Sequence, residues 1–221
     1  MTSLHSLNII IHVLAGVVGL VTGFLAIGTR KGGKNHIKSG RIFLKIITVV
    51  ILTGLIGVFV FHRNTFLLVI TLLSGYTAFS GIRALRLHGN KPVCADYIIP
   101  ILVLSSGIYY LYYIKSIGLF WQPVIIYSTL GALAFVTVYD LLKFFIPVSV
   151  LQKLYVHEHV YKMTSSLIAL VSAFTGTVLP QFKPYSQILP TVVGFVYIIV
   201  IFILMAKKNR FNILIYQASN T

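Results

Sequence analysis

Hydrophobic residues in this chain occur in long runs that are separated by short polar segments. The stretch 46–61, for example, contains no charged residue. A helix needs roughly 20 predominantly apolar residues to cross about 30 Å of membrane hydrocarbon. Seven such segments can be counted, with approximate bounds 5–28, 36–61, 65–86, 97–115, 122–145, 159–179 and 187–206. The pattern predicts an all-α integral membrane protein with one transmembrane domain, a bundle of seven helices over residues 1–221.

The composition agrees with this prediction. Of the 221 residues, 57% are hydrophobic and only 10% are charged, which excludes an ordinary soluble domain. The connections are too short to bury a core of their own. The first segment lacks a preceding basic region and is too long for the apolar part of a signal peptide, so we expect it to be retained as a helix. The single cysteine, Cys94, excludes a disulfide within one chain.

Lysine and arginine are distributed unevenly among the connections. All but three of the 18 lie in or beside the first, third and fifth connections or in the C-terminal tail, the exceptions being Arg63, Lys115 and Lys183. Because positively charged connections stay on the cytoplasmic side, we expect the N-terminus outside and the C-terminus in the cytoplasm. The net charge of +15 then reflects topology and attraction to the anionic headgroups of the lipid bilayer, not nucleic-acid binding.

The chain contains only three acidic residues, Asp96, Asp140 and Glu158, and all three fall on the predicted cytoplasmic side. Asp140 interrupts an apolar run, where a carboxylate without a partner costs several kcal/mol. Lys143 could pair with it locally. The candidate partners on other helices are Arg41, His36 and His159. Glu158 and Lys162 are four residues apart in the favourable order, which is typical of an ordinary pair on a helix surface.

His36 and His159 each begin a predicted helix on the cytoplasmic side, so their imidazoles can reach the same depth. His157 and His159 point about 200° apart on a helix, and His159 is the better candidate for an inward position. We therefore expect His36, Arg41, Asp140 and His159 to form a polar cluster that binds a metal, haem or quinone. Glu158 would join His36 and His159 as a metal ligand.

His12 lies within the first apolar segment, and Gly16, Gly19 and Gly23 share its helix face. Two interpretations fit this face. The glycines could allow close packing of a neighbouring helix, with His12 bonded to that helix. Alternatively, a flat cofactor, haem or quinone, could lie against the glycines with His12 as its ligand or hydrogen-bond partner. The paired histidines of a four-helix dihaem protein do not occur in the predicted helices.

Several short motifs resemble those of the uncharacterised bacterial multi-pass proteins that are grouped as a domain family of unknown function and labelled "predicted membrane protein". They are His12-x-x-x-Gly16, KGGKNHIKSGR at 31–41, Asp140, His159 with Met163, Ala173-Phe174 and LPTVVG at 189–194. The resemblance implies a seven-helix fold in the bacterial cytoplasmic membrane. Similar proteins often have an arginine before the methionine, whereas this chain has Lys162, which cannot offer a bidentate contact.

Three functions fit these observations. The first is a ligand-binding or redox membrane protein that uses the polar cluster. The alternatives are a small-solute or proton-coupled transporter and a structural subunit of a membrane complex. The chain has no HExxH, CxxC or GxSxG motif and no phosphate-binding glycine loop followed by Lys-Ser or Lys-Thr. Whether the protein is an enzyme therefore stays open at this level, as do its partners and oligomeric state.

Overall fold

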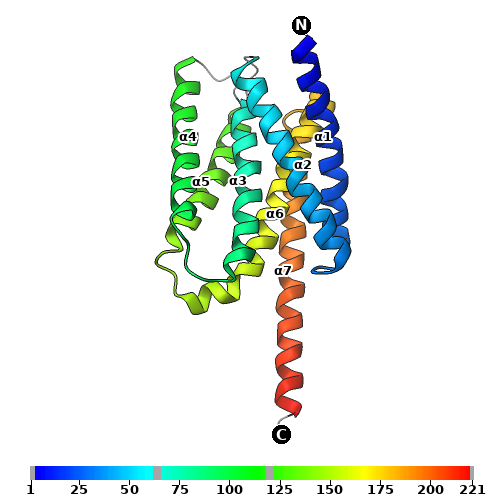
Figure 1. The fold of residues 1–221 in the computed structure, drawn as a ribbon, viewed down its shortest axis with the longest axis vertical. Helices are drawn as coiled ribbons and strands as arrows, with labels where there is room; N and C mark the ends of the chain where they lie inside the picture. Colours follow the sequence, from blue (N-terminus) through cyan, green and yellow to red (C-terminus); the bar gives the residue numbers. More distant parts are fainter. Residues whose placement is uncertain (1–2, 62–65, 118–121, 220–221) are drawn as a thin grey trace.

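The computed structural model describes residues 3–61, 66–117 and 122–219, and every regular element in these ranges is helical. The helices form an elongated bundle in which consecutive members run in opposite directions, with the two termini at opposite ends (Figure 1). Their bounds are α1 Ser3–Gly28, α2 Lys34–Phe59, α3 Phe66–Leu87, α4 Ala95–Ile117, α5 Pro123–Leu142, α6 Val148–Val178, the 3-10 turn η1 Pro180–Phe182, and α7 Tyr185–Ser219.

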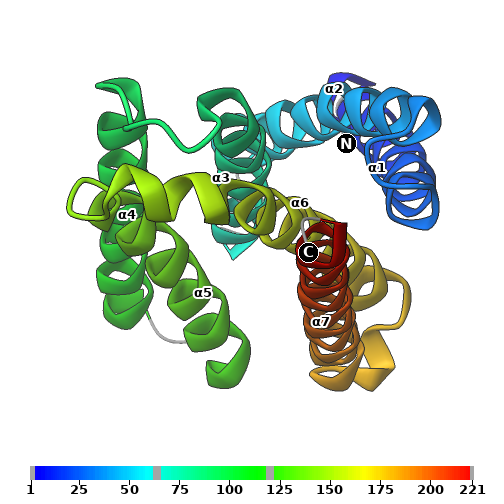
Figure 2. The same cartoon turned by 90° about the horizontal axis from the view of Figure 1, so that it is seen from below.

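Six helices of the described part of the chain, all except α6, are long and apolar enough to span a membrane. This finding indicates a multi-pass membrane protein made of α-helices. That α6 also spans the membrane stays a prediction, although it lies inside the bundle between the other helices (Figure 2). Its length of 31 residues is sufficient for a crossing, and its lower hydropathy comes from the ionisable residues between Lys153 and Lys162.

Two helices extend by more than ten residues beyond the bounds that the hydropathy pattern predicts. Helix α6 begins at Val148, directly after Pro147, rather than at residue 159, and α7 continues to Ser219 rather than ending near 206. Hydropathy marks where a chain enters hydrocarbon, whereas a helix ends where its backbone hydrogen bonds end. The polar stretch 153–162 is therefore helical and belongs to the same helix as the apolar residues that follow it.

Helices α3 and α6 form the centre of the bundle, as the view from below shows (Figure 2). Helix α6 packs against α3, α7 and α1, and α3 also contacts α2, α4 and α5. The central pair is joined by reciprocal hydrogen bonds, because Ser74 Oγ donates to Ser166 O at 3.2 Å and Ser166 Oγ donates to Ser74 O at 3.0 Å. Both serines are buried. Such small hydroxyl residues allow helices in a membrane to approach closely.

The glycines of α1 serve helix packing. A Cβ on Gly23 would lie 2.6 Å from Leu167 Cδ1 of α6, and one on Gly19 would lie 3.1 Å from Leu170 Cδ2. Gly16 has no neighbour within 4 Å of the same position. The side chains of α6 thus occupy most of the helix face against which a flat cofactor could have lain. Gly19 and Gly23 therefore allow close packing of a neighbouring helix, which is the first of the two interpretations.

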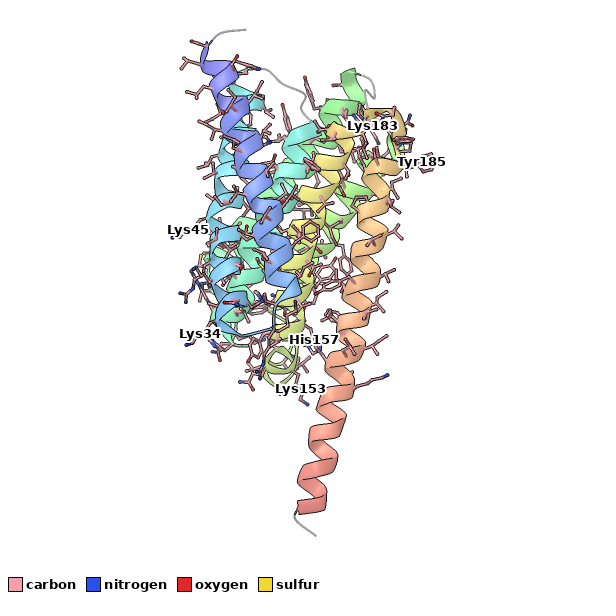
Figure 3. The ribbon with its side chains drawn as sticks, turned by 90° about the vertical axis from the view of Figure 1, so that its right-hand side faces the viewer. Lys34, Lys45, Lys153, His157, Lys183 and Tyr185 are labelled. Carbon is pink, nitrogen blue, oxygen red and sulfur yellow. The ribbon has the colours of Figure 1, made fainter. Side chains whose placement is uncertain are left out.

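Basic side chains gather at one end of the bundle. The connections α1–α2, α3–α4 and α5–α6 meet there (Figure 1), and Lys34 and Lys153 lie toward this end, whereas Lys183 and Tyr185 lie at the other (Figure 3). We call the first the basic end. The alternation of connections agrees with the predicted topology. That the basic end faces the cytoplasm, and that the membrane is the bacterial cytoplasmic membrane, stay predictions.

Candidate functional site

Four charged side chains, from α6 and from the C-terminal end of α5 with the residue that caps it, meet inside the basic half of the bundle. Lys162 Nζ lies 2.6 Å from Asp140 Oδ1 and 3.3 Å from Glu158 Oε2. Lys143 Nζ lies 2.8 Å from the same oxygen of Asp140 and also contacts Glu158 Oε2. Each ammonium group therefore contacts both carboxylates. We call Asp140, Lys143, Glu158 and Lys162 the charge cluster.

Two tyrosines complete the hydrogen bonds of the charge cluster. Tyr76 of α3 donates its hydroxyl to Asp140 Oδ2 at 2.7 Å, and Tyr139 of α5 donates to Glu158 Oε1 at 2.9 Å. Both oxygens of each carboxylate are thus engaged. The ring of Tyr139 also lies near both ammonium groups, with its centroid 5.4 Å from Lys143 Nζ and 5.6 Å from Lys162 Nζ. This distance is within the range of cation–π attraction.

The charge cluster is shielded from solvent. The exposed fraction of the side chain is 1% for Lys162, 7% for Asp140, 8% for Glu158 and 9% for Lys143. Two carboxylates and two ammonium groups give a formal charge of zero, so each buried charge has an opposite partner. Replacing a buried ion pair by apolar residues is often neutral or stabilising. Packing alone therefore does not require these four residues, and a function for the cluster has to be considered.

The helices place the cluster by simple spacing. Asp140 lies in the last turn of α5 and Lys143 follows directly after the helix, three residues on. Glu158 and Lys162 are one turn apart on α6. These spacings set two acid–base pairs on facing surfaces of α5 and α6, and each lysine also contacts the carboxylate of the other pair. Because α3 lies beside both helices, Tyr76 reaches the same point.

A mainly apolar cavity of about 620 Å³ lies between α3, α5, α6 and α7, in the half of the bundle opposite the basic end, and we call it the chamber. Its polar groups are mostly hydroxyls, including those of Thr77 and Ser165. Three of its apolar lining residues, Val124, Phe135 and Phe195, are exposed. The chamber is therefore open at the side, where α5 and α7 lie apart at the periphery of the bundle (Figure 2).

The chamber and the charge cluster are adjacent along the same three helices. On α3, Thr77 lines the chamber and its neighbour Tyr76 bonds the cluster. On α6, Tyr161 lines the chamber and its neighbour Lys162 belongs to the cluster. On α5, Val136 lines the chamber one turn before the aspartate of the cluster. The cluster thus lies between the chamber and the basic end.

Aromatic rings form the boundary of the chamber on the side of the charge cluster. The ring of Tyr161 packs against Phe135 of α5, with centroids 6.5 Å apart, and against Phe195 of α7, with centroids 6.4 Å apart. These three rings connect α5, α6 and α7. Movement of α5 against α6 would therefore change the chamber wall and the charge cluster together.

The residues expected to form one polar cluster are distributed differently. His36 Nδ1 bonds Ala26 O of α1 at 2.8 Å, and His159 Nδ1 bonds Gly81 O of α3 at 3.0 Å. Both nitrogens act as donors, because a carbonyl oxygen only accepts. Arg41 is exposed on α2. The cations beside Asp140 are the two lysines of the charge cluster, so the expectation that Arg41 or a histidine would pair with Asp140 is corrected.

The expected metal ligands do not gather into one set either. Among the described residues there is no group of three or more His, Cys, Asp or Glu side chains placed to hold a metal ion. His36 and His159 are close enough to interact electrostatically. Glu158 belongs to the charge cluster, where both of its oxygens already have partners.

His12 contacts a neighbouring helix, as the packing interpretation predicts. Its Nδ1 lies 2.8 Å from Thr53 Oγ1 of α2. The histidine also lines a second cavity, of about 360 Å³, between α1, α2, α3 and α6, and we call this the His12 cavity. The His12 cavity shares Ile70 and Ala169 with the chamber, and no residue of the charge cluster lines it.

Three members of the site were not among the residues proposed from the sequence, namely Lys162, Tyr76 and Tyr139. Lys162 was expected in a surface pair with Glu158. The pair exists, but it is buried and extends to Asp140. A signal was available, since Lys162 is followed by a run without charged residues up to Lys183. The sequence did not distinguish Tyr76 and Tyr139 from the other tyrosines, because the chain contains 13 of them.

The remaining acidic residue forms a separate pair near the basic end. Arg83 of α3 holds Asp96 of α4 in a bidentate contact, with Nε to Oδ1 and Nη2 to Oδ2 both at 2.7 Å. Asp96 also accepts from the backbone N–H of Val93. All three acidic residues of the chain are thus paired with a cation.

Comparison of the chain with family models, with curated proteins and with solved structures finds no match.

Proposed function

We propose that this protein carries a small, mainly apolar molecule that enters the chamber sideways from the bilayer, and that the charge cluster is the gate at the basic end. The observation that supports this function best is the adjacency of the chamber and the cluster on α3, α5 and α6. Ligand sites in proteins are typically apolar cavities of 300–1,000 Å³ with a few polar groups, and the chamber fits this description.

The gate follows from the contacts of the cluster. In the observed state, the four charges hold the C-terminal end of α5 against α6 and separate the chamber from the basic end. Exchange of the molecule at that end requires these helices to part. Protonation of either carboxylate would leave the lysines in excess and weaken the contact, which provides a route for coupling transport to protons.

Binding in the chamber is tested with a neutral fluorescent probe, 1-N-phenylnaphthylamine, added to the full chain in lipid nanodiscs. We expect a saturable fluorescence increase above that of empty nanodiscs. Ala132→Trp should abolish the saturable part, because Ala132 lines the chamber and the indole ring would fill it. Val138→Trp is the matched control, since Val138 lies on the same helix but is exposed and does not line the chamber. Equal binding by both variants would contradict the proposal.

Gating is tested without any substrate, by labelling a cysteine inside the chamber. The background variant is Cys94→Ser, and the reporter is Ser165→Cys, a nearly isosteric change. In inside-out vesicles, a membrane-impermeant maleimide reaches the reporter only when the gate opens. Asp140→Asn should raise the labelling rate about tenfold or more, because each 1.4 kcal/mol lost from the closed state is a factor of ten in the equilibrium.

The control for this labelling experiment is Asp96→Asn, which makes the same chemical change in the partly buried ion pair at the basic end. Its labelling rate should remain that of the background. If Asp140→Asn unfolds the protein, the double variant Asp140→Asn/Lys162→Met tests gating in its place. It removes both partners of the Lys162–Asp140 pair and keeps the formal charge of the cluster at zero. An unchanged labelling rate in a folded Asp140 variant would contradict the proposal that the charge cluster is a gate.

A further inference from the structure

In the His12 cavity, the hydrogen bonds of Thr53 indicate which nitrogen of His12 carries the ring proton. Thr53 Oγ1 donates its proton within α2, because it lies 2.8 Å from Val49 O and 3.1 Å from Val50 O. With its proton placed there, Thr53 Oγ1 accepts at its contact with His12 Nδ1. On this basis we assign the ring proton to Nδ1. In the neutral imidazole, Nε2 is then the acceptor.

Two other polar side chains that line this cavity are engaged as hydrogen-bond donors. Asn8 Nδ2 donates to Thr53 O at 3.1 Å, and Ser74 Oγ donates to Ser166 O of α6. Among the described residues, the lining includes no Asp, Glu, Lys or Arg. Most of the remaining wall is apolar, including Ile9, Ile51 and Leu170. The cavity therefore suits a ligand that offers a single hydrogen-bond donor and is otherwise apolar.

The backbone of α2 helps to keep room beside the imidazole. A Cβ on Gly54 would lie 3.2 Å from Thr71 Oγ1 and 3.7 Å from His12 Cε1. The edge of the ring that contains Cε1, next to Nε2, therefore lies close to Gly54. Glycine at this position brings α2 near the ring without adding a side chain to the cavity.

We propose that the His12 cavity is a second ligand site, which binds a lipid-soluble alcohol or phenol through a hydrogen bond from the hydroxyl of the ligand to His12 Nε2. A hydroxyl group in hydrocarbon has no other acceptor, so the bond is not opposed by loss of water. The site is separate from the chamber. Ile70 and Ala169 line both cavities, and the reciprocal Ser74–Ser166 bonds join α3 and α6 at this level.

The test compares two fluorescent ligands of nearly equal shape, 2-naphthol and 2-methoxynaphthalene, with the full chain in nanodiscs at neutral pH. Only 2-naphthol can donate a hydrogen bond. We expect saturable binding of 2-naphthol with an affinity about fivefold to tenfold higher than that of the ether, which corresponds to one net hydrogen bond. Equal affinities, or no saturable binding of 2-naphthol, would overturn the proposal.

Two variants of His12 test whether this residue causes the preference for 2-naphthol over 2-methoxynaphthalene. His12→Phe keeps an aromatic ring and removes the acceptor, so 2-naphthol should bind only as well as the ether. His12→Gln returns an acceptor and should restore part of the preference, and this rescue distinguishes the site from a general effect on folding. Ala132→Trp, which fills the chamber, should leave the preference unchanged. If Ala132→Trp abolished it instead, the probe would be bound in the chamber and the second site would be disproved.

Discussion

Asp140→Asn is expected to lower the free energy of unfolding by about 3–5 kcal/mol, the range found when one partner of a buried ion pair is removed. Asp140 Oδ1 contacts both lysines of the charge cluster, and Lys162 is the most completely buried of the four side chains. The variant leaves two ammonium groups with one carboxylate. The change is measured by SDS-induced unfolding of the purified protein in mixed micelles, followed by circular dichroism.

Two variants make this prediction specific. Asp140→Asn/Lys162→Met restores a formal charge of zero, since Lys143 and Glu158 still pair, and it should recover more than half of the lost stability. Asp96→Asn should cost less than Asp140→Asn, because the Arg83–Asp96 pair is more accessible to solvent, with 23% of the Arg83 side chain exposed. Strictly additive effects of the two substitutions in the double variant would show that the charges do not stabilise each other.

Gly89→Ala is expected to destabilise the protein by about 2–4 kcal/mol, as the sum of backbone strain and steric overlap. Gly89 lies in the α3–α4 connection with a φ of 78°, a conformation that disfavours a side chain. A Cβ there would also lie 2.4 Å from Gln152 Cα and 2.5 Å from Gln152 N. These are backbone atoms of α6, so a rotamer change cannot relieve the overlap. The same SDS unfolding assay measures the loss.

Gly32→Ala separates the two causes. Gly32, in the α1–α2 connection, has a similar φ of 74°, but no atom lies within 4 Å of the position of its Cβ. Its substitution should cost only the strain, about 1 kcal/mol. The difference between the two variants then reports the contact between the α3–α4 connection and the first turns of α6. Equal losses would mean that the connection moves away from α6 without cost.

That contact matters for the proposed gate, because it fixes the first turns of α6 near the basic end. Glu158 and Lys162 lie farther along the same helix. A looser α3–α4 connection would let α6 shift relative to α5. We therefore expect a folded Gly89→Ala protein to label more readily at the Ser165→Cys reporter than Gly32→Ala does.

The sequence was sufficient to predict the order of the seven α-helices in the described residues, whereas the crossing of the membrane by all seven stays a prediction. A membrane span must bury about 20 apolar residues and satisfy every backbone group within itself, so its length and type can be read locally. The charge pattern likewise predicted that the connections rich in lysine and arginine share one end. The position of Asp140 in an apolar run also indicated that it needs a partner, and Lys143 was among the candidates.

The identity of the other partners could not be predicted in this way. Arg41, His36 and His159 all had suitable depth, yet the side chain that reaches Asp140 is Lys162. Depth along the membrane follows from the sequence, whereas the rotation of each helix about its axis depends on packing. The rotation of α6 that directs Lys162 toward α5 also brings Leu167 and Leu170 against α1.

The sequence by itself thus determined that this is a helical membrane protein, which residues lie near which end, and which polar groups need a partner. These features depend on the free energy of transferring each segment into the membrane, which is a property of that segment alone. Only the tertiary structure decided that two local acid–base pairs form one neutral cluster, that Tyr76 joins it, and that a chamber lies beside it. Contacts and cavities between helices depend on crossing angles and side-chain shapes, which act between segments distant in the chain.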